Sequence, residues 1–515
     1  MLQKPADSYR TKIRSLDELR RIRRQGLFES KSMVLCHGVF DLVHPGHIRH
    51  LTYAKEKADV LVVSITADIH IAKAKYRPFV PQDLRALNLA ALEMVDYVMI
   101  DHNPTPIPTI LALHPEFFAK GFEYSNNPKT VQEVEALNTY GGELLLTPGD
   151  VVYSSSHIIE TAPPNLSLEK LMLLMEAEGV GFDRLCGVID GFRGKRVHVL
   201  GDTIVDSLSY TTLIGGMGKT PTPSVCFSNR VDFVGGAAIV AKHLRAAGAE
   251  VVFSTVLGDD KLAEMVLNSL EEDGIECRTI IDRSRPTTHK NAFVCGDYRL
   301  LKVDTVDNRS ITNEQVDTFA QELRDIKADA VAFCDFRHGI FNHNTTPFLI
   351  EAIPNGCFKV ADSQVASRWG NILEFGGFDL ITPNEKEARF ALGDQDAGIR
   401  TIAARLYEVV GCKTVILKLG DRGLLTCRGR EHDNPRTYFV VDSFARHVVD
   451  PVGAGDALLA YATLSLLVDK SEVVASILGS LAAALECEYD GNVHILHEDV
   501  HTRLEEIKKL CEPSS

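Results

Sequence analysis

The chain has 515 residues, of which 45% are hydrophobic and 24% are charged, and its formal net charge is −15. A chain of this length exceeds what one hydrophobic core can organise, so we expect about two to four globular domains. The strong negative charge excludes nucleic acid and anionic membrane surfaces as the main partners.

The eleven cysteines are scattered along the chain, and no two of them form a C-x-x-C pair. Their odd number and irregular spacing indicate unpaired thiols in a reducing compartment rather than a disulfide framework. No apolar run approaches the roughly 20 residues that span a bilayer, and the first residues lack the apolar core of a signal peptide. These observations predict a cytoplasmic protein.

Short β-branched runs alternate with helical patterns along the first third of the chain, which predicts an α/β fold with a parallel sheet covered by helices. We expect one such domain, Rossmann-like, over residues 1–162. Its predicted strands are residues 33–36, 60–65, 97–100, 117–120 and 143–146, and its main helices are residues 45–57 and 81–95.

Pro163-Pro164-Asn165 interrupts this pattern, and helical periodicity follows it. We therefore interpret residues 163–192 as a linker with a lead-in helix. A second α/β domain is expected over residues 193–515. Its predicted core strands are residues 195–200, 328–334, 358–362, 379–382 and 414–418, and helices are predicted at residues 385–392 and 473–485.

The first motif that indicates chemistry is Gly38-Val39-Phe40-Asp41-Leu42-Val43-His44-Pro45-Gly46-His47, which directly follows a predicted strand. Pro45 suits the start of a helix, and His44 and His47 are three residues apart, so both imidazoles can face one side of that start. A helix N-terminus with two imidazole donors suits a triphosphate and the charge that develops when pyrophosphate leaves. The competing interpretation is a zinc site made of His37, His44, His47 and His50, but cysteine or carboxylate ligands at metal spacing are missing there.

With these residues, the region of about residues 18–161 resembles the cytidylyltransferase-like nucleotidyltransferases, and most of all the nucleotidyltransferase half of bifunctional heptose phosphate kinase/nucleotidyltransferases. The resemblance implies ATP or CTP as nucleotidyl donor, and it implies roles for these residues. His44, His47 and Lys73 would be catalytic, and the nucleotide and its phosphates would be bound by Gly38, Phe40, Asp41, Arg85, Ser155 and Ser156. Where the family commonly has Thr-Asn before this motif, the chain has Cys36-His37, which puts one substrate contact in doubt.

The second motif is Asp450-Pro451-Val452-Gly453-Ala454-Gly455-Asp456. Its Gly-Ala-Gly turn can present N–H groups to an anion at a helix start, and Asp456 directly follows, close enough to take a proton from an attacking hydroxyl. Four further segments support this interpretation, each beside a predicted strand or helix. They are residues 201–206, 235–238, 382–387 and 418–423.

In order and spacing these segments resemble the ribokinase/PfkB sugar kinases over about residues 193–508, and the resemblance implies a ribokinase-like α/β fold. By the resemblance Asp456 is the catalytic base and Gly453, Ala454 and Gly455 form the anion hole. The remaining roles implied are sugar binding by Asp206, Gly235 and Gly236, nucleotide or phosphate binding by Asn384, Glu387, Lys418 and Gly420, and metal binding by Glu387 (Mg²⁺) and Asp450 (possible K⁺).

The departures from that family lie on the acceptor side. Ile239 replaces an asparagine, His338 replaces a lysine, and Gln364 stands where another lysine is usual. Each lost charged donor weakens a hydrogen-bonded sugar phosphate by roughly 1.5–3 kcal/mol. Because the catalytic loop itself is intact, we interpret these changes as an altered substrate.

The two resemblances together imply a bifunctional enzyme of nucleotide-activated sugar synthesis. It would phosphorylate a sugar phosphate similar to heptose 7-phosphate with Mg-ATP, and transfer a nucleotidyl group to a sugar 1-phosphate with release of pyrophosphate. The transferase precedes the kinase, the reverse of the common fusion. Two alternatives stay open: the same chemistries on another sugar or polyol phosphate with CTP, or an active transferase with a sugar-sensing kinase-like domain. A homodimer is possible.

Overall fold

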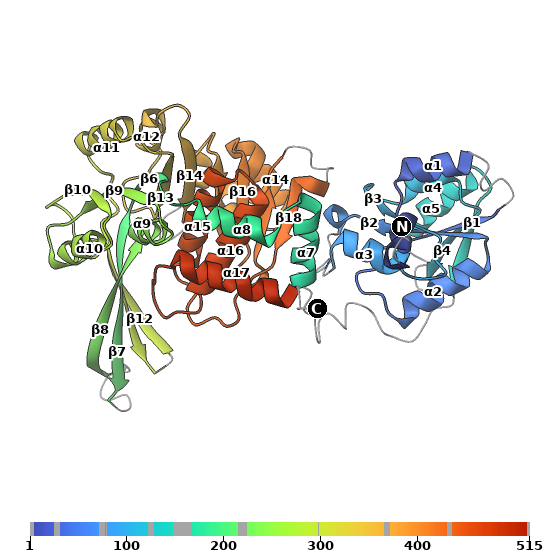
Figure 1. The fold of residues 1–515 in the computed structure, drawn as a ribbon, viewed down its shortest axis with the longest axis horizontal. Coiled ribbons are helices and arrows are strands. Elements are labelled where there is room, and N and C mark those ends of the chain that lie inside the picture. Colours follow the sequence, from blue (N-terminus) through green and yellow to red (C-terminus); the bar gives the residue numbers. More distant parts are fainter. Residues whose placement is uncertain are drawn as a thin grey trace. The chain divides into compact units, whose positions relative to one another are not determined.

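The computed structural model describes residues 5–24, 31–71, 78, 80–121, 128–147, 167–214, 224–296, 298–364, 371–429 and 435–511. The chain divides into two compact units, Met1–Leu166 and Ser167–Ser515. Each unit has its own sheet and its own hydrophobic core (Figure 1).

The first unit contains a parallel five-stranded sheet in the order β3-β2-β1-β4-β5, with helices against both faces. All five predicted strands are present, so the Rossmann-like α/β prediction is confirmed. In chain order, with 3₁₀ helices marked η, the elements are η1 (Pro5–Lys12), α1 (Leu16–Arg24), β1 (Met33–Gly38), α2 (Pro45–Glu56), β2 (Val60–Thr66), η2 (Asp68–His70), α3 (Gln82–Ala90), β3 (Tyr97–Asp101), α4 (Ile107–Leu113), β4 (Phe117–Gly121), α5 (Pro128–Asn138) and β5 (Glu143–Thr147).

The central strand β1 shows why this sheet forms. Its side chains alternate between the two faces: Val34 and Cys36 enter one buried cluster, and Met33 and Leu35 enter the other. A strand buried on both faces has a continuous apolar sequence, which is the pattern of a parallel sheet between helices. The loops at the C-terminal ends of the strands then carry the polar residues.

The second unit is built on a nine-stranded sheet in the order β10-β9-β6-β13-β14-β15-β16-β17-β18. It is parallel from β10 to β16, and β17 and β18 continue it antiparallel. The elements of this unit are α7 (Ser167–Glu178), α8 (Phe182–Asp190), β6 (Arg196–Gly201), β7 (Thr203–Leu213), β8 (Val225–Gly236), α9 (Ala237–Ala246), β9 (Glu250–Leu257), α10 (Lys261–Glu272), β10 (Glu276–Ile281), β11 (His289–Cys295), β12 (Tyr298–Thr305), α11 (Asn313–Asp325), β13 (Ala330–Asp335), α12 (Thr346–Ala352), β14 (Phe358–Ser363), η4 (Ile372–Glu374), β15 (Leu380–Ile381), α13 (Glu385–Leu392), α14 (Ile399–Val410), β16 (Thr414–Lys418), η5 (Gly420–Arg422), β17 (Leu424–Cys427), η6 (Pro435–Thr437), β18 (Tyr438–Val441), α15 (Ala454–Val468), α16 (Glu472–Glu486) and α17 (His497–Cys511).

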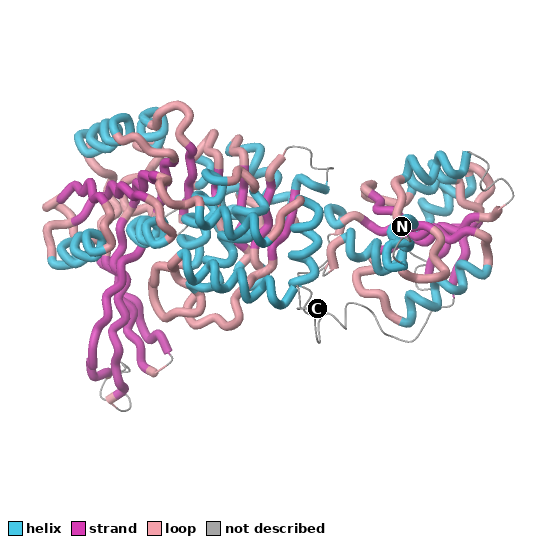
Figure 2. The backbone as a smooth tube through the Cα atoms, in the orientation of Figure 1, coloured by secondary structure: helices cyan, strands magenta, loops and turns pink. Residues whose placement is uncertain are grey.

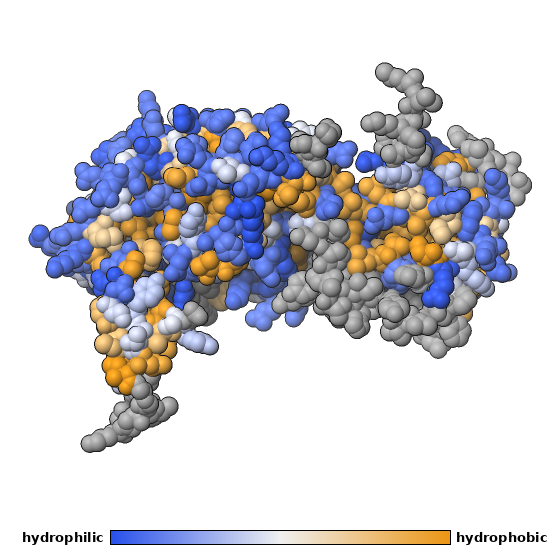
Figure 3. Space-filling model, turned by 60° about the horizontal axis from the view of Figure 1, so that its bottom comes forward, coloured by the Kyte–Doolittle hydropathy of each residue, from blue (hydrophilic) through white to orange (hydrophobic). Residues whose placement is uncertain are grey.

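A separate four-stranded sheet, in the order β12-β11-β7-β8, belongs to the same unit. Figure 2 shows its long strands extending away from the nine-stranded sheet. One face of its outer part carries exposed apolar side chains, including Phe227, Tyr298 and Leu301, which are 59%, 77% and 60% exposed. Figure 3 shows hydrophobic surface on these projecting strands.

Residues 167–192 do not form a free linker in this structure. They form helices α7 and α8, whose apolar side chains Leu171, Met175, Phe182 and Leu185 are buried in the core of the second unit. The apolar face of the lead-in helix therefore packs against the rest of the second unit.

No helix in the described part of the chain combines the length and the apolar character that crossing a membrane requires. All eleven cysteines are free thiols.

Candidate active sites

The first candidate site lies where β1 ends and α2 begins. His44 is the N-cap of α2, and its Nδ1 accepts a hydrogen bond from the backbone N–H of Gly46 at 3.2 Å. The imidazole rings of His44 and His47 stack with centroids 3.9 Å apart. The two predicted histidines are therefore adjacent at a helix N-terminus, where N–H groups are available to a phosphate.

Both imidazoles are neutral at physiological pH. Burial, together with the neighbouring His44 and His50, lowers the pKa of His47 to about 4. Burial also lowers the pKa of His44. Neutral imidazoles can donate N–H hydrogen bonds to phosphate oxygens without carrying a permanent charge, so their donation strengthens as negative charge develops.

Buried side chains hold the turn between β1 and α2 in its conformation. Phe40 is buried at a positive φ of 48°, and its ring contacts His47 with centroids 5.0 Å apart. Gly38 ends β1 beside that ring, where an added Cβ would lie 3.1 Å from Phe40 Cε2. Asp41 is buried, and its Oδ1 accepts the backbone N–H of Val80 at 2.8 Å. Asp41 thus ties the loop to a second segment of the chain.

Arg85 in α3, which was predicted to contact phosphate, forms hydrogen bonds within the protein. Its side chain is 0% exposed, and its guanidinium donates to the backbone carbonyls of Val39, Val80 and Thr66 and to the carboxylate of Asp68. All three guanidinium nitrogens therefore donate hydrogen bonds to groups of the protein itself. In this structure Arg85 therefore holds the loop after β1 in place through the carbonyl of Val39.

Replacing Arg85 with Met is expected to reduce the stability of the first unit by about 3–5 kcal/mol, because the buried Asp68 loses its cation and three carbonyls lose a donor. The midpoint of urea inactivation, followed through nucleotidyl transfer, measures this loss. Arg49→Met on the exposed side of α2 is the matched control. If the midpoint is unchanged and the KM for the nucleotide increases, the result would instead support the predicted contact between Arg85 and phosphate.

The histidines of the competing zinc interpretation are engaged elsewhere. His37 Nδ1 lies 2.9 Å from Ser64 Oγ and its Nε2 lies 3.2 Å from Thr66 Oγ1. His50 Nδ1 lies 2.8 Å from Thr147 Oγ1. The described residues of the first unit contain no cluster of three metal ligands. The predicted residues Lys73, Ser155 and Ser156 lie outside the described residues.

The second candidate site is centred on Asp456 in the first turn of α15, with Gly453 as N-cap and Ala454 and Gly455 between them. Asp456 is 7% exposed, and its pKa is raised to about 8. Burial is the main cause, and the carboxylates of Asp362, Asp206 and Glu387 raise it further, while Lys418 opposes them. Predicted residues of three separate segments, together with Asp362, which was not predicted, therefore interact electrostatically with one carboxyl group.

Lys418, at the end of β16, neutralises part of this negative charge. Its Nζ donates to both carboxylate oxygens of Asp362, at 3.1 and 3.0 Å. Nζ also closely approaches Gly455, since a Cβ there would lie 3.0 Å from it. The ammonium is thus positioned beside the predicted anion hole. Gly420 follows in η5, with a φ of 66°.

Asn384 and Glu387 begin helix α13. The Asn384 side chain accepts from the Glu387 N–H at 2.9 Å, and the Glu387 carboxylate accepts from the Asn384 N–H at 2.7 Å, which is a capping box. The backbone of Asn384 also pairs with Lys418. This pairing fixes the buried Glu387 carboxylate near Lys418 and Asp456.

Gly453 must be a glycine in this fold. Its φ is 93°, and an added Cβ would overlap the buried carboxylate of Glu486 and approach Asn492 Oδ1 to 2.9 Å. Asn492 Nδ2 in turn donates to Asp206 Oδ2 at 3.2 Å. Asn492 therefore lies beside the turn at Gly453 and is hydrogen-bonded to the predicted sugar-binding carboxylate.

The predicted acceptor side is formed where β7 and β8 pair. Asp206 lies on β7, and Gly235 and Gly236 end β8. A Cβ on Gly235 would overlap Asp206 Oδ2, and Gly236 has a φ of 63° as it enters α9. The two glycines thus let the backbone approach the carboxylate closely.

A model of the pfkB family carbohydrate kinases matches residues 195–498 of this chain. The chain belongs to the pfkB family. A second model, of the cytidylyltransferase-like family, matches residues 35–161. Each of the two matched regions contains one of the two candidate sites.

The curated relatives support the same assignment. A protein named "Bifunctional protein HldE" from Desulfatibacillum aliphaticivorans is 26% identical over 64% of this chain and 67% of its own length. Another of the same name, from Caulobacter vibrioides, is 28% identical over 59% of this chain and 62% of its own length. The chain therefore matches about three fifths to two thirds of the length of these relatives.

Among solved structures, the phosphofructokinase-2 from Escherichia coli in complex with potassium is similar, with a TM-score of 0.51 and 17% sequence identity. The match covers 61% of this chain and 99% of that chain. This similarity confirms the ribokinase-like fold of the second unit.

Two lysines that were not predicted from the sequence lie on the predicted acceptor side of this pfkB kinase unit. Lys290 on β11 pairs in register with Asp206 on β7 and with Asp304 on β12, and Lys302 lies two residues before Asp304. Alternation along the strands therefore places Asp206, Lys290 and Lys302 on the same sheet face. The pKa of Asp206 is raised by burial, and both ammonium groups oppose that rise. No local motif marks these lysines, because the contact depends on strand register.

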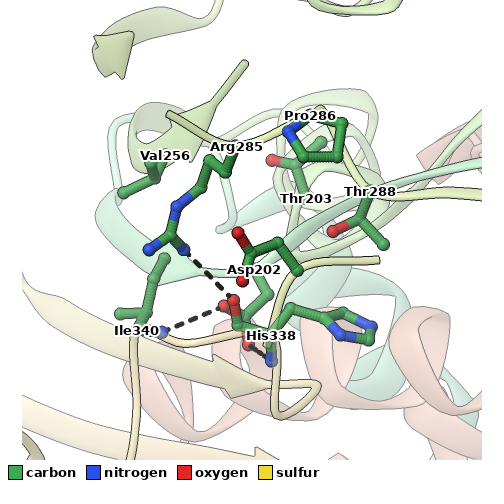
Figure 4. A pocket seen from close by; sticks show the side chains of 9 residues that line it. Asp202, Thr203, Val256, Arg285, Pro286, Thr288, His338 and Ile340 are labelled. Atoms are coloured by element: carbon green, nitrogen blue, oxygen red, sulfur yellow. Dashed lines mark hydrogen bonds between the residues drawn. The ribbon is translucent and has the colours of Figure 1, made fainter. Parts of the chain in front are cut away.

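The substituted acceptor residues have distinct surroundings. His338 lies in a small pocket with Thr203, Arg285 and Thr288 (Figure 4). Its Nδ1 is 2.7 Å from Asn308 Oδ1, and burial lowers its pKa to about 3, so the ring is neutral. Asp202 anchors this loop by accepting the backbone N–H groups of Phe336 and His338 at 3.0 and 3.1 Å and of Ile340 at 3.3 Å.

The other two substitutions do not place a charge in the site. Ile239 is buried in α9, and the backbone N–H of Gln364 donates to the carbonyl of Asp335 at 2.9 Å. On the predicted acceptor side, Lys290 and Lys302 therefore supply positive charge that positions 338 and 364 do not.

The pH dependence of phosphorylation follows from the environment of Asp456. A carboxyl group acts as a base only when it is ionised, and a pKa of about 8 means that half of the Asp456 carboxyl groups are ionised at that pH. We expect kcat/KM of the kinase to increase with pH, to be at half its maximum near pH 8 and to level off above it. Nucleotidyl transfer in the same buffers is the control, because His47, with a pKa of about 4, is already neutral there. A flat kinase profile between pH 6 and 9 would contradict this role of Asp456.

Proposed function

We propose that the chain is a bifunctional enzyme of nucleotide-activated sugar synthesis. The pfkB kinase unit transfers the γ-phosphoryl group of ATP to a hydroxyl of a sugar phosphate, and the first unit transfers a nucleotidyl group to a sugar 1-phosphate with release of pyrophosphate. The observation that supports the proposal most is the convergence of Asp456, Lys418, Glu387 and Asp206 at the start of α15.

In the kinase step, Asp456 takes the proton of the attacking hydroxyl. Asp206 and Asn492 position the acceptor, and the N–H groups at the start of α15 bind the transferred phosphoryl group together with Lys418. No covalent enzyme intermediate is needed, because positioning and charge stabilisation supply most of the acceleration in this chemistry.

Magnesium fits this site. Asp362 and Glu387 both raise the pKa of Asp456, so the site holds more negative charge than Lys418 balances. Glu387 and Asp362 are the residues that would hold Mg²⁺, which favours carboxylate oxygens. The bound ion would neutralise charge on the phosphates of ATP.

Asp450 does not fit as a potassium ligand in this structure. One of its carboxylate oxygens pairs with Arg299 of β12 at 2.7 Å, and the other accepts the N–H of Val452 at 3.2 Å. The carboxylate is therefore committed to an ion pair that joins the four-stranded sheet to the loop before α15. We derive no step through K⁺.

The acceptor we propose is a sugar phosphate similar to heptose 7-phosphate. Lys290 and Lys302 supply positive charge beside Asp206, which favours an acceptor that already carries a phosphate over a free sugar. The resemblance of the sequence motifs to heptose phosphate kinases favours a heptose. A small-molecule sugar phosphate and a nucleoside triphosphate are therefore the proposed partners.

The decisive experiment is a mass-spectrometric assay of the purified chain with Mg-ATP and a panel of acceptors. The panel contains heptose 7-phosphate, fructose 6-phosphate, a polyol phosphate and the unphosphorylated sugars. A bisphosphate formed from heptose 7-phosphate supports the proposal. Turnover of another phosphate alone would show that Ile239, His338 and Gln364 accompany a changed substrate, and no turnover would favour a sugar-sensing unit. Sugar 1-phosphates with ATP or CTP, assayed for pyrophosphate, identify the nucleotidyl donor.

Replacing Lys290 with Met is expected to raise the KM for the phosphorylated acceptor about tenfold or more, because a charge-assisted hydrogen bond contributes about 1.5–3 kcal/mol. Steady-state kinetics with varied acceptor measures this change. Lys261→Met on exposed α10 is the matched control. If the KM for an unphosphorylated analogue increases equally, Lys290 does not contact the phosphate.

We also propose that the chain forms a homodimer through the four-stranded sheet. The exposed Phe227, Tyr298 and Leu301 on this sheet form an apolar surface of the kind that subunit contacts bury (Figure 3). Light scattering coupled to gel filtration tests this, and a monomeric mass would exclude the dimer.

A further inference from the structure

Three side chains of metal-ligating type meet away from both candidate active sites. They are Cys186 of α8, and His501 and Glu505 of α17. One ligand atom from each lies within 4.8 Å of the others. Among the described residues, this is the one group of three histidine, cysteine or carboxylate side chains with such spacing.

The fold presents these groups as a preformed set. His501 and Glu505 are four residues apart, so they project from the same face of α17 one turn apart. Helix α8 packs against that face and supplies Cys186 from the opposite side (Figure 1). All three side chains are half-buried, which leaves the group reachable from solvent while its geometry is constrained by packing.

The local hydrogen bonding shows that the thiol already faces the carboxylate. Cys186 Sγ donates to Glu505 Oε1 at 3.6 Å. Burial raises the pKa of the thiol, and the Glu505 carboxylate raises it further. The neighbouring cation Lys508 forms a salt bridge with Asp183 at 2.9 Å. Lys508 is therefore engaged beside the group of three side chains.

We propose that Cys186, His501 and Glu505 bind a zinc ion. A thiolate, an imidazole and a carboxylate are the three ligand types that zinc accepts in tetrahedral sites, and water completes the fourth position. On binding, the thiol proton is released to solvent and the S–H···O hydrogen bond is replaced by two bonds to the metal. The thiolate and the carboxylate together balance the two positive charges of the ion.

The proposed site has a structural role. It connects α8, near the beginning of the pfkB unit, to α17, its last helix. A metal that binds only the folded form stabilises that form by mass action. Zinc therefore secures α8 to α17, outside the loop at Gly453–Asp456.

The test uses the full-length protein after a chelator has removed bound metal. The protein is titrated with Co²⁺ and with Zn²⁺. Excess Mg²⁺ is present to occupy sites that have oxygen ligands. We expect one equivalent of Co²⁺ to give a thiolate-to-metal charge-transfer band that Zn²⁺ abolishes. Zn²⁺ should also raise the melting temperature of the kinase unit, and EDTA should reverse the increase. Cys186→Ser and His501→Gln should remove the band and weaken zinc binding about tenfold or more.

The controls are Cys277→Ser, a half-buried thiol on β10, and His497→Gln at the first position of α17. Both should keep the band and the zinc-dependent melting shift. The proposal is overturned if the wild-type protein gives no charge-transfer band, or if Cys186→Ser keeps it. It is also overturned if the variants and the wild type bind zinc equally.

Discussion

Replacing Asp456 with Asn is expected to lower kcat/KM of sugar phosphorylation by about 10²–10⁴-fold, because the acceptor hydroxyl loses its base. Nucleotidyl transfer should proceed at the wild-type rate, since its residues belong to the other compact unit. The two activities are measured on the same preparation, phosphorylation by product mass and nucleotidyl transfer by pyrophosphate release.

The stability of this variant separates a catalytic effect from misfolding. The pKa of Asp456 is raised because burial and three carboxylates disfavour its charge, so the neutral Asn side chain should not lower the melting temperature. Asp317→Asn on the exposed face of α11 controls for the loss of a carboxylate in the same unit. Retained phosphorylation in Asp456→Asn would show that another group is the base.

Replacing His47 with Asn is expected to lower the rate of nucleotidyl transfer by about 10²–10³-fold, the usual cost of losing one donor to developing charge. His47 is packed between His44 and Phe40 at the start of α2, so it is held rigidly for this role. Phosphorylation should be unaffected. The rate is measured under saturating nucleotide, so that a binding defect is distinguished from a defect in the chemical step.

His70→Asn is the matched control for His47, because His70 belongs to the same unit and contacts the backbone carbonyl of His102. An equal loss in both histidine variants would indicate general damage to the first unit. Together, Asp456→Asn and His47→Asn should form a reciprocal pair, each keeping the activity that the other loses. A mixture of the two variants should then perform both reactions.

The sequence predicted the fold class and most strands of the two main sheets, because their apolar runs are buried on both faces. It did not predict the four-stranded sheet. The strand β12 is exposed along its whole length, and β7 and β8 mix polar with apolar residues. Such strands lack the apolar run that marks a buried strand, so their pairing depends on partners distant in the sequence.

The candidate sites show the same division at the level of single residues. Asp456, Gly453 and His47 were predictable because they lie in short motifs at helix starts, where neighbours in sequence are also neighbours in space. Arg85 belongs to such a motif, yet the structure surrounds it with carbonyls and Asp68. Its partners come from three other segments, and no local pattern contains them.

By itself, then, the sequence determined that two glycine-containing turns, predicted to bind phosphate, begin helices α2 and α15, because glycine geometry and helix N-termini are local properties. Tertiary structure decided which charges face each other. Strand register placed Lys290 and Lys302 on the face of Asp206, and folding brought Asn492 to Asp206 beside the turn at Gly453. It also brought Cys186 to His501 and Glu505. Electrostatic interactions depend on distance in space, and chain folding alone sets that distance between segments remote in sequence.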